Sequence, residues 1–505
     1  MNIWKRWKMR RGREYHPPKK PLYPGPPEAE ALAALFGDCG DFRSLSLRLG
    51  GAKGRVEARL CYLDGLVDGD AVGEAVLRPL TEEERFGEVK GAEEAAALTM
   101  EALAWFYSSQ LRRSLEETAQ DLLCGCCALV LDGLAVTFET KAKLGRGVEQ
   151  PETEKTVKGA KEAFTETLRR NTALLRRRLR CPELKLRELT VGRRSRTRVG
   201  ILYVEGLTDP LLPELVQSRL EGLDLDGLLS TGDLEEYLPE KSSPFPQMLA
   251  TERPDRFALE LMQGRAGLLV DGLPLGFLFP ATLAEMLRVP EDRAAHFTVA
   301  SALTLLRCLA LFLSLLLPAL YVAVTMYHQE MIPTRLMLSI IQSKQDVPFS
   351  TAGEILGMLI AFELLQEAGL RLPSAVGQSV SIIGALIVGQ SAVEAKVISP
   401  AAVIVVAVAG ITGYTMPNQD MAAALRLCRF GMVLLSLGLG LFGIVAGSLL
   451  LIYYLCTLEP FGTAFLSPFC DGSVRSVLGV LLRRPLPREK YRLPWLKPVD
   501  KRRQK

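Results

Sequence analysis

Residues 308–326 read CLALFLSLLLPALYVAVTM, a run of 19 residues without a charged side chain. At a rise of about 1.5 Å per residue, roughly 20 helical residues cross a hydrocarbon core of about 30 Å. Three further uncharged runs follow, at 372–393, 397–419 and 430–458. A buried core helix could imitate one such run. Four in close succession predict membrane-spanning helices.

The charge distribution separates this region from the rest of the chain. Residues 301–458 hold 14 charged side chains, whereas the remainder of the 505 residues holds 104. This contrast excludes both a uniform soluble protein and a transporter embedded over its whole length. It predicts a large soluble N-terminal part, a compact membrane domain and a short basic tail.

The soluble part contains an internal repeat. LCYLDGLVD at 60–68 matches ILYVEGLTD at 201–209, and LVLDGLAVTF at 129–138 matches LLVDGLPLGF at 268–277. The offsets, 141 and 139 residues, are nearly equal and the order is the same, so we expect a duplicated domain. Each copy reads as strand, turn, helix and then a hairpin around Asp-Gly, which is typical of an α/β subdomain.

The predicted fold class is therefore a duplicated α/β N-terminal domain followed by an α-helical multi-pass membrane domain. The expected segments, in chain order, are a disordered Pro-rich N-terminus (1–40), the first α/β subdomain (41–150), a basic helical linker (151–198), the second α/β subdomain (199–297), a membrane domain with about four spans and one charged helix (298–458), and a basic tail (459–505).

Charge asymmetry predicts the orientation of the spans. The tail 483–505 carries ten Lys or Arg and two acids, which favours the cytoplasmic side. The basic N-terminus has no apolar core and is not a secretory signal peptide. With both ends inside, the number of crossings is even, and four spans place Arg426 and Arg429 on the outer side.

One segment of the membrane domain is charged. It reads STAGEILGMLIAFELLQEAGLRLP at 350–373 and contains Glu354, Glu363, Glu367 and Arg371. The last three follow at intervals of four, so they share one helix face. Two interpretations stand open: an interfacial amphipathic helix with a wet polar face, or a re-entrant helix that lines a pore or cavity.

Other polar clusters predict structure rather than chemistry. Cys124, Cys126 and Cys127 lack the paired spacing of a zinc site, and the chain has only three His. The carboxylates at 64, 68, 205 and 209 are typical of turns and helix caps. We expect no catalytic, cofactor or metal site, and no enzyme.

Two further patterns concern packing and charge. The block 169–198 holds twelve Arg or Lys against two acids, and we expect a solvated linker or contact with anionic headgroups rather than nucleic acid. Gly443 and Gly447 form a GxxxG pattern, which permits close helix approach.

Several motifs resemble those of a known family. They are PFPQMLATERPD (244–255), GLLVDGLP (267–274), LPALYVAV (317–324), YHQEMIPT (327–334), FELLQEAGLRLP (362–373) and IIGALIVGQSAV (382–393). Together they resemble the A subunit of spore nutrient-germinant receptors, the GerA/SpoVAF family, from about residue 45 to 468. Glu252, Arg253, Pro254 and Asp255 lie in the specific TERPD motif and are candidates for a structural role. Gln366 departs from the family, which commonly has Arg there.

The resemblance implies a protein of the spore inner membrane, with its N-terminal domain and C-terminal tail in the cytoplasm. It implies a transporter-like B subunit and a lipoprotein C subunit as partners, and a homo-oligomeric ring that conducts ions when nutrient binds. In such a ring Glu354, Glu363, Glu367 and Arg371 are the candidate ion pathway. A non-conducting membrane scaffold and a germination-amplifying paralogue are the alternatives. A membrane enzyme that uses Asp64 or Asp209 ranks last.

Overall fold

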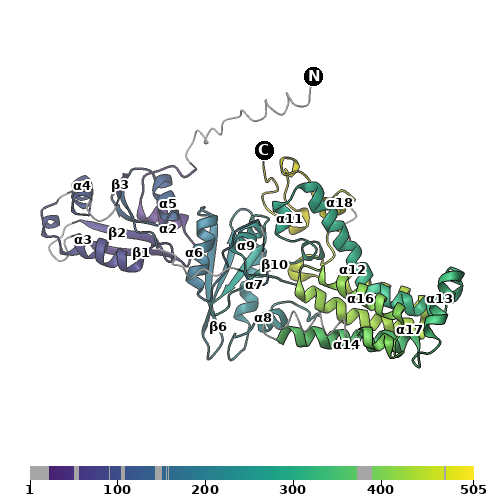
Figure 1. Ribbon diagram of the computed structural model, residues 1–505. Coiled ribbons are helices and arrows are strands. Elements are labelled where there is room, and N and C mark those ends of the chain that lie inside the picture. Colours follow the sequence, from purple (N-terminus) through teal and green to yellow (C-terminus); the bar gives the residue numbers. More distant parts are fainter. Residues whose placement is uncertain are drawn as a thin grey trace, which may run out of the picture. The chain divides into compact units, whose positions relative to one another are not determined.

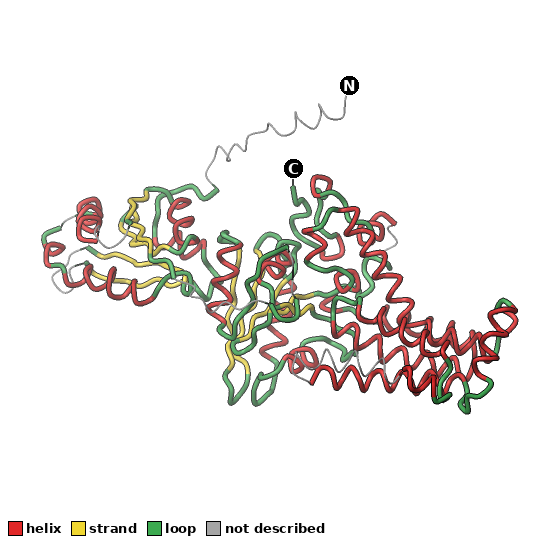
Figure 2. The backbone as a smooth tube through the Cα atoms, viewed as in Figure 1, coloured by secondary structure: helices red, strands yellow, loops and turns green. Residues whose placement is uncertain are grey.

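The computed structural model describes residues 22–49, 56–89, 91–103, 108–142, 151–154, 156, 158–371, 389–470 and 474–504. The chain divides into two compact units. The first unit comprises Met1–Glu154, Lys161–Leu229 and Thr251–Gly276, and the second comprises Lys155–Ala160, Ser230–Ala250 and Phe277–Lys505. Figure 1 labels the elements, and Figure 2 shows that strands gather in the N-terminal half of the chain and long helices in the C-terminal half.

The first five-stranded sheet is antiparallel and has the order β1-β2-β4-β5-β3. Alternate side chains of β2 and β4 pack against helices on the two faces of the sheet, which bury two apolar clusters. The strands are β1 (Phe42–Arg48), β2 (Glu57–Leu63), β3 (Ser109–Arg112), β4 (Cys126–Leu131) and β5 (Leu134–Glu139). The helices are α2 (Ala29–Leu35), η2 (Ala71–Leu77), α3 (Arg78–Glu82), η3 (Glu84–Gly87), α4 (Ala92–Leu103) and α5 (Leu115–Leu123).

The second sheet has the order β6-β7-β9-β10-β8, which is the same sequence of strands as in the first sheet. Its strands are β6 (Leu184–Val191), β7 (Thr197–Val204), β8 (Leu249–Thr251), β9 (Ala266–Val270) and β10 (Gly276–Phe279). The helices that contact this sheet are α6 (Leu168–Arg178), α7 (Leu211–Glu221) and α9 (Pro254–Leu261). Helix α8 (Thr231–Tyr237) belongs to the second unit. Two sheets with one topology are what a duplicated sequence predicts.

The repeated Asp-Gly and Glu-Gly turns have a common backbone reason. Gly65 and Gly206 have φ values of +87° and +74°, and Gly133 and Gly272 have +71° and +91°. These are left-handed conformations that glycine adopts without strain. Asp64 and Glu205, which directly precede two of these glycines, pair with Arg169 (3.2 Å) and Lys185 (3.3 Å) instead of capping a turn. Asp68 accepts the backbone N–H of Asp70 (3.2 Å), and Asp209 accepts that of Leu211 (3.1 Å). Both are turn and cap contacts, as the sequence predicts.

Two expected boundaries in the N-terminal half differ from the structure. Residues 1–21 lie outside the described residues, but α2 begins at Ala29 and buries Leu32 and Phe36 in the first unit, so the predicted disordered segment 1–40 is too long. The predicted linker 151–198 contains α6, β6 and the start of β7. It is therefore part of the second sheet and its covering helix.

The basic block 169–198 is folded into α6 and the second sheet rather than forming a linker, although Arg193, Arg194 and Arg196 are exposed. Arg176 is 1% exposed, and its guanidinium makes two hydrogen bonds of 2.8 Å each with the Asp41 carboxylate. Arg169 pairs with Glu188, and Arg187 pairs with Asp38 at 3.0 Å. The acids that balance this block come mostly from distant parts of the chain.

The second unit is built around long apolar helices, which lie side by side in Figure 1. Their shared core includes Val322, Ile355, Val406 and Val433. The helices are α10 (Leu283–Met286), α11 (Glu291–Ala294), α12 (Phe297–Met326), α13 (Thr334–Lys344), α14 (Thr351–Arg371), α16 (Pro400–Tyr414) and α17 (Gln419–Cys456), with the 3₁₀ turn η4 (Gln329–Met331).

Helix α17 is two arms joined by a turn at Gly440, where φ is +57° and the backbone is not helical. An added Cβ at Gly447 would lie 2.7 Å from Met432 Sδ, although these residues would be roughly 22 Å apart along one straight helix. A Cβ at Gly443 would collide with the carbonyl oxygen of Leu435. The second arm therefore folds back onto the first, and the two glycines of the GxxxG pattern allow this approach.

Two described helices, α12 and α17, are long and apolar enough to cross a membrane, and α16 is apolar but has only 15 residues. The uncharged run 430–458, predicted as one span, is instead interrupted by the turn at Gly440. The run 397–419 contains the shorter α16. Most of the run 372–393 lies outside the described residues. The charged segment forms one continuous helix of 21 residues, α14, and not a re-entrant half-helix.

The C-terminal segment packs within the second unit. It contains η5 (Pro460–Gly462), α18 (Val474–Leu481), η6 (Leu486–Arg488) and η7 (Pro494–Leu496). Trp495 and Leu496 are buried with Val480 and Ala284 in a small apolar cluster. Phe279 stacks on Phe461 with the ring centroids 4.8 Å apart.

Candidate functional site

The charged face of α14 meets the first arm of α17. Glu363 forms an ion pair with Arg426, with 3.1 Å between Oε1 and Nη1. The same guanidinium nitrogen donates to Gln366 Oε1 at 2.8 Å. An arginine at position 366 would bring a second cation against Arg426, so the uncharged Gln366 suits this neighbour.

Arg429 lies one helical turn beyond Arg426, inside the helix packing. Its residue exposure is 4%, and it donates to Ser314 Oγ of α12 at 2.5 Å. The structure thus places Arg429 within the helix packing, a position that the sequence did not predict. A buried cation among apolar helices is costly and marks a functional position more often than a packing position.

Glu354 occupies a different place on α14. Its side chain is fully buried and pairs with Lys344 Nζ at 2.9 Å. It also accepts hydrogen bonds from Ser399, at 2.8 Å from the backbone N–H and 2.6 Å from the hydroxyl. Ser399 caps the start of α16 by accepting the N–H of Ala402. Glu354 therefore joins the end of α13, the start of α14 and the start of α16.

The predicted site residues do not form one cluster. Glu354 precedes Glu363 by nine residues, about 13 Å along a helix. Glu363 is half-exposed and Glu367 is exposed, and the side chain of Arg371 lies outside the described residues. Sequence reasoning missed the partners Arg426, Lys344 and Ser399. The only signal for them was that each is a polar residue at the edge of an apolar run.

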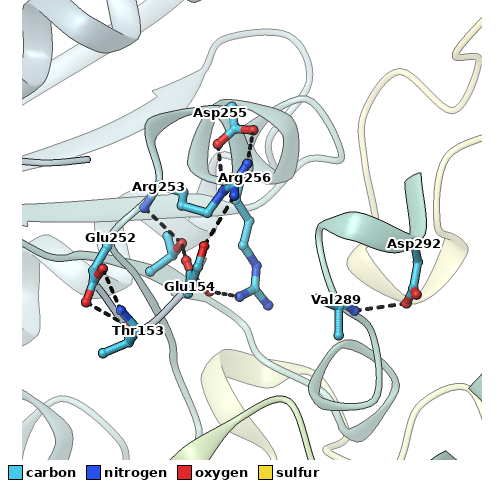
Figure 3. Close-up of polar contacts among 9 residues, drawn as sticks. Thr153, Glu154, Glu252, Arg253, Asp255, Arg256, Val289 and Asp292 are labelled. Atoms are coloured by element: carbon cyan, nitrogen blue, oxygen red, sulfur yellow. Dashed lines mark hydrogen bonds and ion pairs between the residues drawn. The ribbon is translucent and has the colours of Figure 1, made fainter. Parts of the chain in front are cut away.

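The TERPD motif of the first unit is a joint between two segments, as Figure 3 shows. The Glu252 carboxylate accepts the backbone N–H of Glu152 at 2.8 Å and the hydroxyl of Thr153 at 2.6 Å. Arg253 is 1% exposed and makes two hydrogen bonds with the Asp255 carboxylate, at 3.0 and 2.7 Å. These contacts fasten residues 151–154 to the start of α9.

Pro254 and Glu154 also belong to this joint. Pro254 occupies the first turn of α9, where its missing N–H costs nothing. Glu154 accepts hydrogen bonds from Thr251 and from the Arg256 guanidinium. The motif thus fixes residues 151–154 against the start of α9. This is consistent with the predicted structural role of Glu252, Arg253, Pro254 and Asp255.

Two of the three clustered cysteines are partly or fully buried thiols. Burial raises the pKa of the Cys126 thiol to about 11 and that of Cys127 to about 12, so both stay protonated at neutral pH. In the described ranges, no three His, Cys, Asp or Glu side chains are grouped as ligands for a metal ion.

Glu235, a carboxylate outside the long helices, has a raised pKa. Burial, together with the Asp420 carboxylate, raises the pKa of Glu235 on α8 to about 7. The folded protein thus binds this proton more tightly than the unfolded chain, so the free energy of unfolding falls as pH rises from about 4.5 to about 7.

We expect Glu235→Gln to remove this pH dependence. The variant should melt several degrees above the unsubstituted protein at pH 8 and within about 1 °C of it at pH 5. The measurement is a thermal melt of the detergent-solubilised protein at both pH values, with the exposed neighbour Glu236→Gln as control. An equal shift of the melting temperature at both pH values would contradict the assignment.

Comparison with known proteins covers most of the chain. Residues 30–494 match the family described as Bacillus/Clostridium GerA spore germination protein. Spore germination protein KA of Bacillus subtilis is 34% identical over 438 residues, which cover 86% of this chain and 80% of that protein. The membrane protein YfkQ of the same organism is 36% identical over 433 residues, 84% and 83% of the two chains.

A solved structure matches the N-terminal half more weakly. It is the crystal structure of the N-terminal domain of the A subunit of the Bacillus megaterium spore germinant receptor GerK3. The match has a TM-score of 0.41 and 23% identity, and it covers 52% of this chain and 99% of that chain.

Proposed function

The chain belongs to the GerA family of spore germination proteins, and from this premise we propose that it is a membrane subunit of a nutrient-germinant receptor that assembles into an ion-conducting oligomer. In this proposal nutrient binds to a transporter-like B subunit, a lipoprotein C subunit completes the receptor, and opening of the oligomer starts germination. The subunit lies in the spore inner membrane, with its α/β domain and basic tail in the cytoplasm.

The observation that carries the proposal is the charged contact between α14 and α17. Glu363 and Arg426 pair at 3.1 Å beside a core of apolar helix contacts, and Arg429 is buried nearby. Glu367 lies one turn further along α14 and is exposed. Ionisable groups among membrane helices face a bundle interior or an aqueous path, because lipid solvates them poorly.

We expect the pair Glu363→Gln and Glu367→Gln to slow nutrient-triggered cation release by about tenfold or more, because a cation path would lose its carboxylates. Release is measured on spores that carry the variant as their sole copy, with protein levels checked by immunoblot. Glu394→Gln, an exposed carboxylate of the same unit that bonds to Gln390, is the matched control.

A second set of variants separates conduction from structure. Glu363→Gln alone leaves Arg426 without its carboxylate, so low protein levels could reflect packing. If the pair is structural, adding Arg426→Gln should restore both protein level and cation release. If the Glu363 carboxylate lines an ion path, the protein level should recover while cation release stays slow. Normal release from the double carboxylate variant would refute the pore.

A non-conducting scaffold is the second candidate. The contacts that favour it are the ion pairs of Glu354 with Lys344 and of Glu363 with Arg426, which give both carboxylates structural partners. A scaffold would act through its duplicated cytoplasmic sheets, as would a paralogue that amplifies germination. Current through planar bilayers that contain the purified oligomer distinguishes the two candidates, since a scaffold passes none.

A further inference from the structure

Helix α18 and the residues after it have two apolar faces. Val480 is 2% exposed and packs inward with Ala284, Trp495 and Leu496. On the other side, apolar residues spaced by four positions form one exposed stripe: Val474, Leu478, Leu482 and Leu486, which are 72%, 47%, 42% and 52% exposed. The spacing places Val474, Leu478 and Leu482 on the helix side away from Val480.

Basic side chains accompany this stripe. Arg484, Arg488 and Lys490 are exposed and lie between or directly after its leucines. The acids of this segment are already paired, Glu489 with Arg503 at 2.6 Å and Asp500 with Arg492 at 2.9 Å. The exposed face therefore combines apolar residues with excess positive charge, a combination that suits an anionic lipid surface.

The end of α18 is fixed beside the first turns of α12. The backbone N–H of Arg483 donates to Ser301 Oγ at 2.9 Å, and its guanidinium donates to the carbonyl oxygens of Ala295 and Arg293, at 2.8 and 3.0 Å. These contacts lie within the second unit and anchor the stripe to the helix that begins the apolar region.

The rise of α12 indicates how far these contacts lie from the hydrocarbon core. Arg307 is the last charged residue before the uncharged run of α12, and Ser301 precedes it by six residues, about 9 Å along the axis. The headgroup layer outside the hydrocarbon core is about 5–8 Å thick on each side. If the run from 308 spans the membrane, Ser301 and the end of α18 lie at the outer edge of the headgroup layer.

The first turns of α12 are also apolar and exposed at this level. Val299, Leu303 and Leu306 are 53%, 40% and 56% exposed. The end of α18 therefore lies beside helix turns whose exposed apolar side chains need lipid or protein cover.

We propose that the stripe of Val474, Leu478, Leu482 and Leu486, with Arg488 and Lys490, is a docking face for an anionic bilayer surface. The proposal rests on the membrane location in the proposed function. The leucines enter the headgroup layer, and the basic groups meet lipid phosphates, so the tail lies along the membrane instead of extending into solvent.

Photo-crosslinking of the full-length protein tests this face. p-Benzoylphenylalanine replaces Leu482 in protein reconstituted into vesicles, either of phosphatidylglycerol and phosphatidylcholine at 1:1 or of phosphatidylcholine alone. Leu309, which is 56% exposed on α12, reports insertion, and Leu211, which is 71% exposed in the first unit, is the negative control. Adducts are identified by mass spectrometry.

We expect lipid adducts at Leu482 and Leu309 and none at Leu211. The yield at Leu482 should be roughly fivefold higher with phosphatidylglycerol, and Arg488→Glu with Lys490→Glu should remove that preference. Adducts at Leu309 but none at Leu482, or a crosslink from Leu482 to a second protein copy, would overturn the docking face and leave the proposed function intact. Absence of adducts at Leu309 would overturn membrane insertion itself, and the docking face with it.

Discussion

Replacing Arg176 by Ala should destabilise the first unit by about 3–5 kcal/mol, because it leaves the buried Asp41 carboxylate without its partner. Both side chains are almost completely buried, at 2% and 1% exposure, and their two hydrogen bonds are the 2.8 Å contacts of a bidentate pair. The third donor, Nη1, binds the carbonyl oxygen of Leu184 at 2.7 Å. One substitution thus removes contacts to both β6 and the start of β1.

Hydrogen exchange of the full-length protein in detergent measures this loss. Slowly exchanging amides of α6 and β6 should lose protection by roughly two to four powers of ten. The control is Arg48→Ala, which breaks the surface pair with Glu57, where both side chains are more than half exposed. That pair should contribute less than about 1 kcal/mol.

A third variant identifies the cause of the loss. Arg176→Met combined with Asp41→Leu replaces the ion pair by apolar side chains of similar volume, and it should recover most of the protection. If Arg176→Ala and Arg48→Ala have equal effects, the Arg176–Asp41 pair is not the internal joint that its geometry suggests.

The Arg176–Asp41 pair also shows what the sequence could not predict. The block 169–198 reads as a solvated surface because its local charge is strongly positive. Its balancing carboxylates, Asp41 and Asp38 among them, lie far away in sequence and are brought near by the sheet topology. Local charge counts predict exposure only when the charges have no distant partners.

The duplication, in contrast, could be predicted because it depends on backbone conformation. The left-handed turns at Gly65 and Gly206, and at Gly133 and Gly272, require glycine whatever surrounds them. The same positions therefore keep the same residue in both copies, while the packed side chains differ. Turn glycines preserved the repeat, and the common strand order of the two sheets agrees with it.

Composition predicted where the apolar helices of the membrane region lie in the sequence, but not where those helices turn. An uncharged run shows that a segment prefers an apolar environment, and α12 and α17 have that character. It does not show whether the segment is straight. The turn at Gly440 lies inside such a run, so the segment predicted as a single span is two arms. The burial of Arg429 in the helix packing was likewise not predicted.

Gly443→Ala should prevent this helical hairpin from closing and abolish accumulation of the protein in membranes. The added methyl would meet the backbone carbonyl of Leu435 in the opposite arm, and a backbone oxygen cannot rotate away as a side chain does. In an ordinary helix the same change would stabilise by about 0.5–1 kcal/mol. Packing therefore predicts that Gly443→Ala lowers stability, whereas helix propensity predicts that it raises stability. The backbone clash is the larger effect.

Two neighbouring glycines provide a graded series. A Cβ at Gly438 has no atom within 4 Å, so Gly438→Ala should accumulate normally or melt slightly higher. A Cβ at Gly447 would lie 2.7 Å from Met432 Sδ, at the end of a flexible side chain, so Gly447→Ala should lower the melting temperature by several degrees without abolishing accumulation. Membrane-fraction immunoblots and melts in detergent give both readouts.

The order of the three variants tests the hairpin more strictly than any one of them. A straight α17 would expose Gly438, Gly443 and Gly447 to similar surroundings, and all three alanines would then be neutral or stabilising. A hairpin predicts a severe defect at Gly443, an intermediate one at Gly447 and none at Gly438. Met432→Ala should partly rescue Gly447→Ala, because it removes one of the two side chains that the new methyl meets, the other being Leu435 with Cδ1 at 2.8 Å, but it should not rescue Gly443→Ala. Rescue of both variants would mean that the arms do not meet at the Leu435 backbone.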